Sequence, residues 1–463
     1  MKPEVVIIGA GPAGMSAALA LQSAGACARV VDEQPAPGGQ VYRAVDRVST
    51  SFPEALKVLG ADYAAGKKIT DQFNSAKIAF SPATSVWDIA GGDAPRLGLV
   101  GGEGAEMVYP DYIVLANGAM ERPTPFPGWT LPGVMGVGAA QTLLKDSGLV
   151  PQGRIVIAGT GPLVYLYASQ LIAAGAPPVA ILDTAPPRPP GRLWSPLLRA
   201  AAADWSAIAK GRKWLQQIRA ASVQHVHDVT RWSALGDQKL EAMTYHQGAT
   251  SVRLECDLLL VHDGVIPNTH LSMAADCRHH WNSLQHYWAA EVRVYGETSQ
   301  PGISIAGDNA DIAGADAAAC RGRVVGLGVA CRLGLITAEQ LISQTAADRN
   351  RLQKIAVVRS FLDQFYRPLP AMQLPPDDDT IVCRCEEVTA GEIRQVAKAG
   401  CVGPNQGKAF TRCGMGPCMG RYCGNTVSQI IASARQQTVE QTGHYRIRPP
   451  VRPLSVGQLI DMR

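Results

Sequence analysis

Charged residues are scarce in this sequence, and neither sign dominates. Asp, Glu, Lys and Arg make up 18% of the 463 residues, and the formal net charge is only +4; an average soluble chain has about 25% charged residues. Because 46% of the residues are hydrophobic, the composition excludes a disordered chain. No run of basic residues interleaved with aromatic residues occurs, which argues against nucleic acid, DNA included, as a partner. The low charge also fits a surface partly covered by partner subunits.

Several catalytic motifs are absent as well. The sequence contains no G-x-S-x-G, no G-x-x-x-x-G-K-[ST] and no H-E-x-x-H pattern, which excludes serine hydrolases and P-loop proteins. Eight of the nine histidines fall between His225 and His286. In such a mixed segment we expect them to be packing or interface groups rather than metal ligands. No residue has the pattern of an amine-binding base, so the catalytic residues stay unassigned.

One uncharged stretch, from Val5 to Ala28, is long enough for a signal peptide or a membrane span. Glu4 stands where a signal peptide would carry a basic residue, and a glycine turn divides the stretch into a β-branched part and an Ala/Leu-rich part. We therefore expect a strand, a turn and a helix here. The expected location is the cytoplasm or the inner face of the membrane as a peripheral protein.

The same stretch predicts a dinucleotide-binding unit. An apolar run over 5–8 is typical of a buried parallel strand, and a helix is predicted over 13–24. The G-x-G-x-x-G between them supplies a tight turn, a close approach for a pyrophosphate at the helix N-terminus, and close helix–strand packing. A second strand over 28–31 ends at two acids, either of which could bind a ribose hydroxyl. The candidate contacts are Gly9, Gly11, Pro12, Ala13, Gly14, Asp32 and Glu33.

Three later segments resemble the two-dinucleotide-domain flavoprotein family. They are a Gly-Gly loop at 38–40, an apolar strand that ends at 117–118, and a strand that ends in Gly-Asp at 307–308. The resemblance implies FAD, and it adds Gly39, Gln40, Asn117, Gly118, Gly307 and Asp308 to the candidate contacts. It also implies a split FAD domain, residues 1–118 and 300–345. Disulfide reductases of this kind carry a redox cysteine pair, but here the loop reads GGQVY and Cys256 and Cys277 are isolated, which excludes disulfide reduction.

A second nucleotide-binding unit repeats the first within residues 119–299. An apolar strand over 154–158 leads into Gly159-Thr160-Gly161, and a strand over 179–182 ends at Asp183. Val164 replaces the third glycine, where a branched side chain should hold helix and strand apart. Gly159, Gly161 and Asp183 are the candidate contacts for an adenine nucleotide, NAD or ATP. The alternative is a retained fold that holds no nucleotide.

Six of the eleven cysteines fall between residues 383 and 423. Residues 346–380 are expected to form a linker, 381–435 a small domain, and 436–463 a tail. Four thiolates in two close pairs suit a [2Fe–2S] cluster or a tetrahedral zinc; the candidates are Cys383, Cys385, Cys413 and Cys418, and Cys423 is the alternative to Cys418. The arrangement resembles the bacterioferritin-associated-ferredoxin-like (BFD-like) [2Fe–2S] domain.

Two further runs, TRCGMGPCMGR at 411–421 and VMGVGAAQT at 134–142, carry a more specific resemblance. They are similar to the alpha (large) subunit of hetero-oligomeric, dye-linked amine and imino-acid dehydrogenases, a group that includes opine oxidase/dehydrogenase, D-hydroxyproline dehydrogenase, dye-linked L-proline dehydrogenase and hydrogen cyanide synthase. The resemblance implies a beta subunit like an FAD amino-acid oxidase and a small ferredoxin-like gamma subunit. In some members it implies an FMN at the interface between subunits.

The sequence therefore predicts an α/β protein with two Rossmann-like dinucleotide-binding domains, the second inserted in the first, plus a small helical C-terminal [2Fe–2S] domain. A flavin accepts two electrons and such a cluster accepts one at a time, so the combination favours an oxidoreductase subunit that passes electrons to a non-NAD acceptor. The resemblance implies that the reaction oxidises the C–N bond of an opine, D-hydroxyproline or a related amino or imino acid. The alternatives are a self-sufficient NAD(P)H:acceptor oxidoreductase and a non-catalytic binding module.

Overall fold

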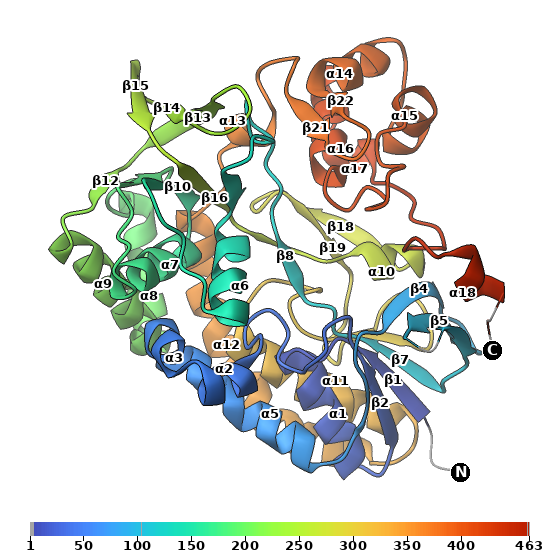
Figure 1. Ribbon diagram of the computed structural model, residues 1–463. Helices are drawn as coiled ribbons and strands as arrows, with labels where there is room; N and C mark the ends of the chain where they lie inside the picture. Colours follow the sequence, from blue (N-terminus) through green and yellow to red (C-terminus); the bar gives the residue numbers. More distant parts are fainter. Residues whose placement is uncertain (1–3, 103, 461, 463) are drawn as a thin grey trace.

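The computed structural model describes residues 4–102, 104–460 and 462, which form two α/β domains and a small C-terminal module (Figure 1). The sheet of the first domain has five parallel strands in the order β20-β7-β1-β2-β3. These strands are β1 (Glu4–Ile8), β2 (Cys27–Val31), β3 (Ala79–Ser81), β7 (Tyr112–Leu115) and β20 (Ile303–Ile305). Because β20 comes from far along the chain, two separated stretches build this domain.

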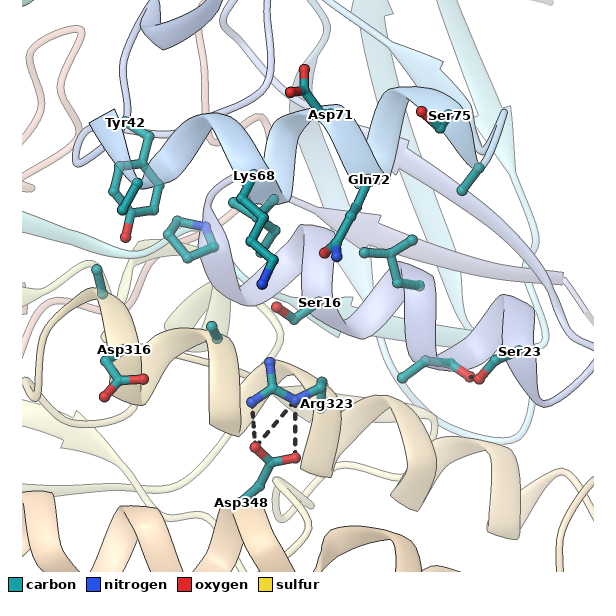
Figure 2. A pocket seen from close by; sticks show the side chains of 18 of the residues that line it. Ser16, Ser23, Tyr42, Lys68, Asp71, Gln72, Ser75, Asp316, Arg323 and Asp348 are labelled. Carbon is teal, nitrogen blue, oxygen red and sulfur yellow. Dashed lines mark hydrogen bonds and ion pairs between the residues drawn. The ribbon is translucent and has the colours of Figure 1, made fainter. Parts of the chain in front are cut away.

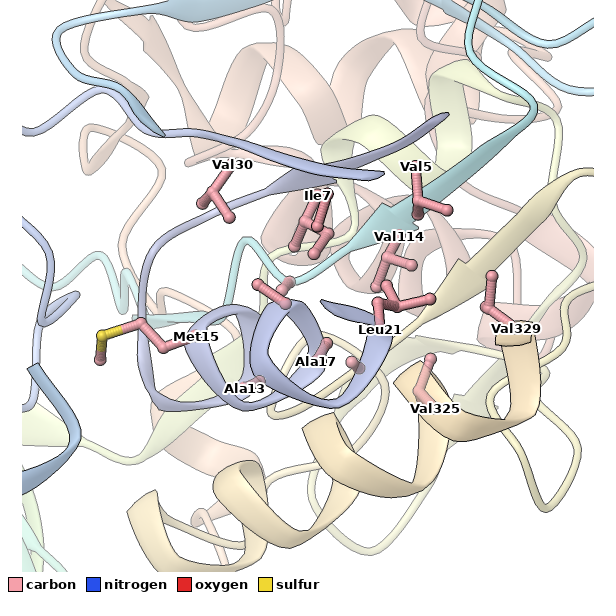
Figure 3. Packing of buried hydrophobic residues seen from close by; sticks show 14 of the residues in the cluster. Val5, Ile7, Ala13, Met15, Ala17, Leu21, Val30, Val114, Val325 and Val329 are labelled. Atoms are coloured by element: carbon pink, nitrogen blue, oxygen red, sulfur yellow. The ribbon is translucent and has the colours of Figure 1, made fainter. Parts of the chain in front are cut away.

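The core of the first domain lies between this sheet and two helices (Figure 3). The helices are α1 (Pro12–Ser23) and α11 (Ala315–Arg332). Ile7, Val30 and Val114 are fully buried, as expected for parallel strands covered by helices. The two helices approach each other closely because α11 carries glycine at the contact: a Cβ on Gly326 would lie 2.6 Å from the carbonyl oxygen of Ala17.

The second domain is inserted between β7 and β20. Its five strands are parallel, in the order β12-β11-β10-β16-β9. They are β9 (Val134–Gly136), β10 (Ile155–Thr160), β11 (Ala180–Asp183), β12 (Gln224–Val226) and β16 (Leu258–Asp263). The helices of this domain are α6 (Val137–Ser147), α7 (Pro162–Ala173), α8 (Trp194–Ala203) and α9 (Trp205–Ala220). This architecture confirms the predicted α/β class with one Rossmann-like domain inserted in another.

Short antiparallel sheets surround and connect the two domains. The pair β8 (Ala119–Glu121) and β17 (Val265–Pro267) forms the connection between them. The others are β4 (Ser85–Ala90), β5 (Arg96–Gly101) and β6 (Gly104–Val108); β13 (Val229–Leu235), β14 (Ala242–Gln247) and β15 (Thr250–Glu255); β18 (His279–Asn282) and β19 (Tyr287–Ala290). The shorter helices are α2 (Val45–Ser51), α3 (Pro53–Leu59), α4 (Ala61–Ala64), α5 (Gly66–Ser75), α10 (His270–Ala274) and a 3₁₀ turn at Gly191–Leu193.

The linker expected over 346–380 is largely helical. Helix α12 (Ala338–Phe365) packs against α8 and α11, and a capping box between Thr337 and Gln340 begins it. A shorter helix, α13 (Pro370–Gln373), buries Met372 in the core of the second domain. The range expected to be a linker therefore contains helices that bury apolar side chains, among them Val358, Phe361 and Met372.

The C-terminal module consists of short strands and mostly short helices. They are β21 (Ile381–Cys383), β22 (Val388–Thr389), α14 (Ala390–Lys398), α15 (Pro404–Thr411), α16 (Gly424–Ala434), α17 (Val439–Thr442) and α18 (Val456–Ile460). The module extends beyond the predicted boundary at 435, because Tyr445, Ile447 and Val451 belong to its buried core. It contacts the rest of the chain where the indole N–H of Trp129 donates to the carbonyl of Ile381 at 2.7 Å. Among the residues described here, no helix combines the length and the apolar character that crossing a membrane requires.

Candidate functional site

The first glycine turn brings β1, β7 and α1 into close contact. Gly9 has φ +108°, and a Cβ there would overlap the carbonyl oxygen of Ala116 at the end of β7. A Cβ on Gly14 would overlap the carbonyl oxygen of Gly9. Pro12 is the first residue of α1, where its missing N–H costs no hydrogen bond. Side chains at Gly9 and Gly14 are therefore incompatible with the packing of α1 on the strands.

The Gly-Gly loop and the Gly-Asp segment meet at the N-terminus of α1. Gly38 N–H donates to the Ala10 carbonyl at 2.8 Å, and a Cβ on Gly39 would lie 2.8 Å from the Cα of Gly11. From the other side, a Cβ on Gly307 would lie 2.7 Å from that of Ala13. Backbone N–H groups at a helix N-terminus, approached by segments without side chains, fit the pyrophosphate of FAD.

The two acids after β2 have different surroundings. Asp32 accepts the backbone N–H groups of Ala10 at 2.6 Å and Gln34 at 2.7 Å, and burial raises its pKa. Glu33 instead pairs with Arg452 from the C-terminal segment. Asp32 thus lies beside the glycine turn, and Glu33 ties the C-terminal segment to this domain.

The remaining predicted FAD contacts lie in a hydrogen-bonded set of strand ends. Asn117 donates to the Asn268 carbonyl at 2.8 Å and accepts from Asn309 at 2.9 Å, so the ends of β7, β17 and β20 are joined. Gly118 belongs to the same junction, since its carbonyl accepts the N–H of Asn268. Asp308 accepts the N–H of Ala313 at 3.0 Å, and burial raises its pKa.

The sequence analysis missed Lys145, which lies on α6 of the second domain. Its ammonium group donates to the carbonyl of Gln40 at 3.0 Å, in the loop beside the glycine turn. Burial lowers its pKa to about 8, and Arg43 adds to the effect. Asn268, Asn309 and Lys145 carry no recognisable motif, because their positions depend on contacts between distant segments.

In the second nucleotide-binding unit, the surroundings of Asp183 differ from those expected for a residue that contacts a nucleotide. Asp183 is fully buried and accepts the hydroxyl of Tyr165 and, at 2.8 Å, the N–H of Ala185. Its carboxylate is thus engaged inside the domain and not presented to a ribose. Val164, the replacement for the third glycine, is itself fully buried in the domain core, so the helix accommodates it.

A bulky side chain also stands at the glycine turn of this unit. The imidazole of His262 lies beside the turn, 3.9 Å from the position of a Cβ on Gly161, and a Cβ on Gly159 would overlap the His262 backbone, as a Cβ on Gly9 overlaps Ala116 in the first unit. Glu121 holds the ring through Nδ1 at 2.6 Å and also accepts the N–H of Gly138. The glycine turn is thus built like the first one, but the buried, hydrogen-bonded Asp183 is not available to the ribose of a bound NAD.

The cysteines of the module gather into two adjacent groups. The Sγ atoms of Cys383, Cys413 and Cys423 all lie within 4.8 Å of one another and are buried, and the Sγ atoms of Cys385 and Cys418 are 3.7 Å apart. Of the four sequence candidates, Cys383 and Cys413 lie in one group together with the alternative, Cys423, and Cys385 and Cys418 form the other. Cys401 is not among them: its thiol donates to the carbonyl of Gly403.

The surroundings of one of these thiols, Cys383, favour a thiolate, whereas hydrogen bonds to Cys383 raise the pKa of Cys413 and Cys423. Hydrogen bonds from the thiols of Cys413 and Cys423 lower the pKa of Cys383 to about 2, and the backbone N–H groups of Gly414 and Glu386 add to the effect. At Gly416 a Cβ would overlap that of Cys385, so the loop can reach the thiols only with glycine. Five thiols with backbone donors are a donor set that fits an iron–sulfur cluster.

A residue of the expected tail supports this site. The hydroxyl of Tyr445 donates to the carbonyl of Cys413 at 2.9 Å, and a Cβ on Gly414 would lie 2.6 Å from its ring. The ammonium group of Lys408 lies 4.6 Å from the ring centroid. No local motif identifies Tyr445, which lies 32 residues from Cys413 in the sequence.

A groove of about 1220 Å³ lies on the side of α1 that faces away from the sheet (Figure 2). Figure 2 shows Lys68 and Gln72 of α5 above it, and the ion pair of Arg323 on α11 with Asp348 on α12 below it. The groove begins beside Pro12 but continues along the outer face of the helix. It is therefore separate from the glycine cradle that fits FAD.

Comparison with known proteins agrees with this geometry. The model of the pyridine nucleotide-disulphide oxidoreductase family matches residues 3–324, and that of the sarcosine oxidase A3 domain matches 378–461. The first match defines the class: an FAD-dependent oxidoreductase. The A subunit of opine oxidase from Rhizobium meliloti is 38% identical over 99% of this chain and 87% of its own length. Its counterpart from Agrobacterium tumefaciens (strain Ach5) is also 38% identical, over 99% of this chain and 92% of its own length.

More distant relatives extend the comparison. Hydrogen cyanide synthase subunit HcnB of Pseudomonas protegens is 28% identical over 98% of this chain and 97% of its own length. The crystal structure of L-proline dehydrogenase from P. horikoshii shares the fold, with a TM-score of 0.69 and 18% identity over 99% of this chain and 79% of that one. The chain belongs to the family of alpha subunits of hetero-oligomeric amine and imino-acid dehydrogenases. The protein is thus a flavin-dependent dehydrogenase subunit.

Proposed function

We propose that this chain is the electron-transferring alpha subunit of a dehydrogenase that oxidises the C–N bond of an opine, D-hydroxyproline or a related amino or imino acid, with a non-NAD acceptor. The observation that carries the proposal is the combination, in one chain, of the glycine cradle at α1 and the five-thiol site around Cys383. The identity of 38% to the opine oxidase relative over nearly the whole chain supports the substrate class.

The cofactors that fit these sites are FAD and a [2Fe–2S] cluster. Together they convert the removal of two electrons into one-electron transfers. The chain's part is to hold both groups: the turn at Gly11 and the loop at Gly39 leave room for the pyrophosphate, and Asp32 stands beside them. The thiols of the module supply four ligands with one to spare.

We assign the cluster ligands as two pairs. The Sγ atoms of Cys385 and Cys418, 3.7 Å apart, suit one iron, and Cys383 with Cys423 suits the other. Hydrogen bonds to Cys383 raise the pKa of both Cys413 and Cys423. Cys423 is preferred because it is also the N-cap of α16, where the helix dipole favours negative charge. Cys413, at 3.9 Å from Cys423, would be the spare buried thiol.

Substrate recognition is assigned to a partner. By resemblance, a beta subunit like an FAD amino-acid oxidase would bind the amine, a small ferredoxin-like gamma subunit would complete the complex, and FMN would lie at the interface between subunits. The NAD(P)H alternative loses support because Asp183 is buried and accepts hydrogen bonds from Tyr165 and Ala185 inside the domain.

The test is a dye-reduction assay on the chain alone and on the complex co-expressed with an amino-acid-oxidase-like partner. We expect the complex to reduce the dye with opines, hydroxyproline or proline, and the chain alone to show little or no activity. We also expect NADH not to bleach the flavin of the chain under anaerobic conditions. Robust amine oxidation by the chain alone, or rapid bleaching by NADH, would contradict the proposal.

A further inference from the structure

A carboxylate and two imidazoles meet at the edge of the second domain. Asp183 is the last residue of β11, His225 lies in the neighbouring strand β12, and His227 follows that strand. The strands are parallel, with Leu182 paired to Val226, so their carboxyl ends lie side by side. The two rings lie next to each other, with centroids 4.0 Å apart, and one nitrogen of each lies near the Asp183 carboxylate.

The ligand atoms of the three side chains converge. The Oδ2 atom of Asp183 lies 3.5 Å from Nε2 of His225 and 3.8 Å from Nδ1 of His227, and all three atoms lie within 4.8 Å of one another. Both nitrogens are buried and have no hydrogen-bond partner in the part of the chain that the structure describes. Buried polar atoms without partners are rare in native proteins, and a bound ion can satisfy them.

The charge of the site also needs a cation. Asp183 is fully buried, and within the described ranges no Lys or Arg forms an ion pair with it. A buried carboxylate without a counter-charge is costly. The hydroxyl of Tyr165 fixes the carboxylate through a hydrogen bond, as outer groups do for metal ligands.

We propose that Asp183, His225 and His227 bind a divalent transition metal ion, and that the ion is zinc. Two imidazoles and one carboxylate are a common donor set for Zn²⁺, with Zn–N distances of about 2.0–2.1 Å. For a tetrahedral site, the distances from Oδ2 of Asp183 to the two imidazole nitrogens need to shorten by a few tenths of an ångström. The histidine side chains are 14% and 25% exposed, which leaves access for a water as the fourth ligand.

The position indicates a structural role. The ion would join the ends of β11 and β12 and hold Tyr165 through Asp183. Tyr165 packs against Tyr366, at a centroid distance of 6.1 Å, immediately after α12 ends. The site would thus fasten the start of the connection to the cysteine module onto the second domain, where a nucleotide would lie in other proteins of this class.

The test is metal analysis of the full chain together with zinc-edge X-ray absorption. We expect one zinc per chain besides the iron of the cysteine module, with a shell of nitrogen and oxygen at about 2.0 Å and no sulfur at about 2.3 Å. The double variant His225→Gln/His227→Gln and, separately, Asp183→Asn should lose the zinc and keep the iron and FAD. The matched control His246→Gln, on β14, should keep all three.

Thermal unfolding supplies a second measurement. Adding zinc to chelator-treated wild type should raise its Tm, because a ligand that binds the native state stabilises it, and should leave the double variant unchanged. The proposal is overturned if folded wild type neither contains zinc nor takes it up, if the bound zinc has a sulfur shell, or if the variants retain it.

Discussion

At the scale of single residues, the cysteine cluster depends on side chains that are distant in the sequence. Cys383 and Cys385 lie on and beside β21, whereas Cys423 caps α16. The C-x-C and C-x-x-x-x-C spacings singled out Cys383, Cys385, Cys413 and Cys418 and offered Cys423 only as an alternative to Cys418. The contact between Cys423 and Cys413 could not be predicted from spacing, because it depends on how α16 packs against α14 and α15.

The ligand assignment predicts different results for two neighbouring thiols. Cys423→Ser should remove most of the iron, since it takes a thiolate from one iron, whereas Cys413→Ser should keep at least half of it. FAD should remain bound in both, because the module lies apart from the glycine cradle. The measurement is iron and acid-labile sulfide per FAD. Equal loss in both variants, or loss only in Cys413→Ser, would refute the assignment.

The buried amine of Lys145 predicts a pH dependence of stability. Burial lowers its pKa from 10.5 to about 8, so between these values the unfolded chain binds a proton that the folded chain does not. Stability should therefore rise with pH from about 8 to 10.5, and the penalty, at most about 3 kcal/mol, is complete below pH 8.

The check is the Tm of wild type and Lys145→Met across this pH range. The difference between the two should shrink as the pH rises, and the exposed control Lys68→Met should run parallel to wild type. Parallel profiles for wild type and Lys145→Met would show that the amine is not perturbed.

At the scale of elements, the glycines at the N-terminus of α1 have two different roles. The fold requires Gly9 and Gly14, whereas the bound ligand requires Gly11. The nearest atom to a Cβ on Gly11 would be the Cα of Gly39 at 3.8 Å, and the φ of Gly11, −75°, suits any residue. Gly14 has no such room, since a Cβ there overlaps the Gly9 carbonyl. The G-x-G-x-x-G pattern predicted both, because its physics is local.

This difference predicts separable effects. Gly11→Val should fold with a Tm close to that of flavin-free wild type but bind FAD at least tenfold more weakly, because its methyl groups fill the pyrophosphate cradle. Gly14→Ala should instead destabilise the chain by about 1–3 kcal/mol through overpacking. FAD content and Tm distinguish the two. An FAD-replete Gly11→Val chain would show that the pyrophosphate lies elsewhere.

Two other parts of the fold, α12 and the C-terminal residues of the cysteine module, could not be predicted from the sequence. Helix α12 runs through a segment assigned in part to a linker, because its apolar residues have no clear one-sided pattern and few of them are buried. The tail residues Tyr445 and Val451 enter the module core through long-range contacts that no local spacing records. Strong local patterns, such as the capping box of Thr389 and Glu392 at α14, were predictable and are present.

At the scale of the whole molecule, the chain joins a flavin fold and a cysteine module and leaves the substrate to a partner. The module is fixed to the first domain through the Val451 N–H on the Trp87 carbonyl at 2.8 Å, and to the second through Trp129. Such direct contacts suit electron transfer between two groups held in one chain.

The most direct test is electron paramagnetic resonance of the complex, frozen under anaerobic conditions after substrate is added. We predict that an opine or hydroxyproline produces the signal of a reduced [2Fe–2S] cluster in the complex. The chain alone, and the complex carrying Cys423→Ser, should give no such signal. A complex whose flavin is bleached by substrate without any cluster signal, or a chain that gives the signal with substrate on its own, would contradict the account.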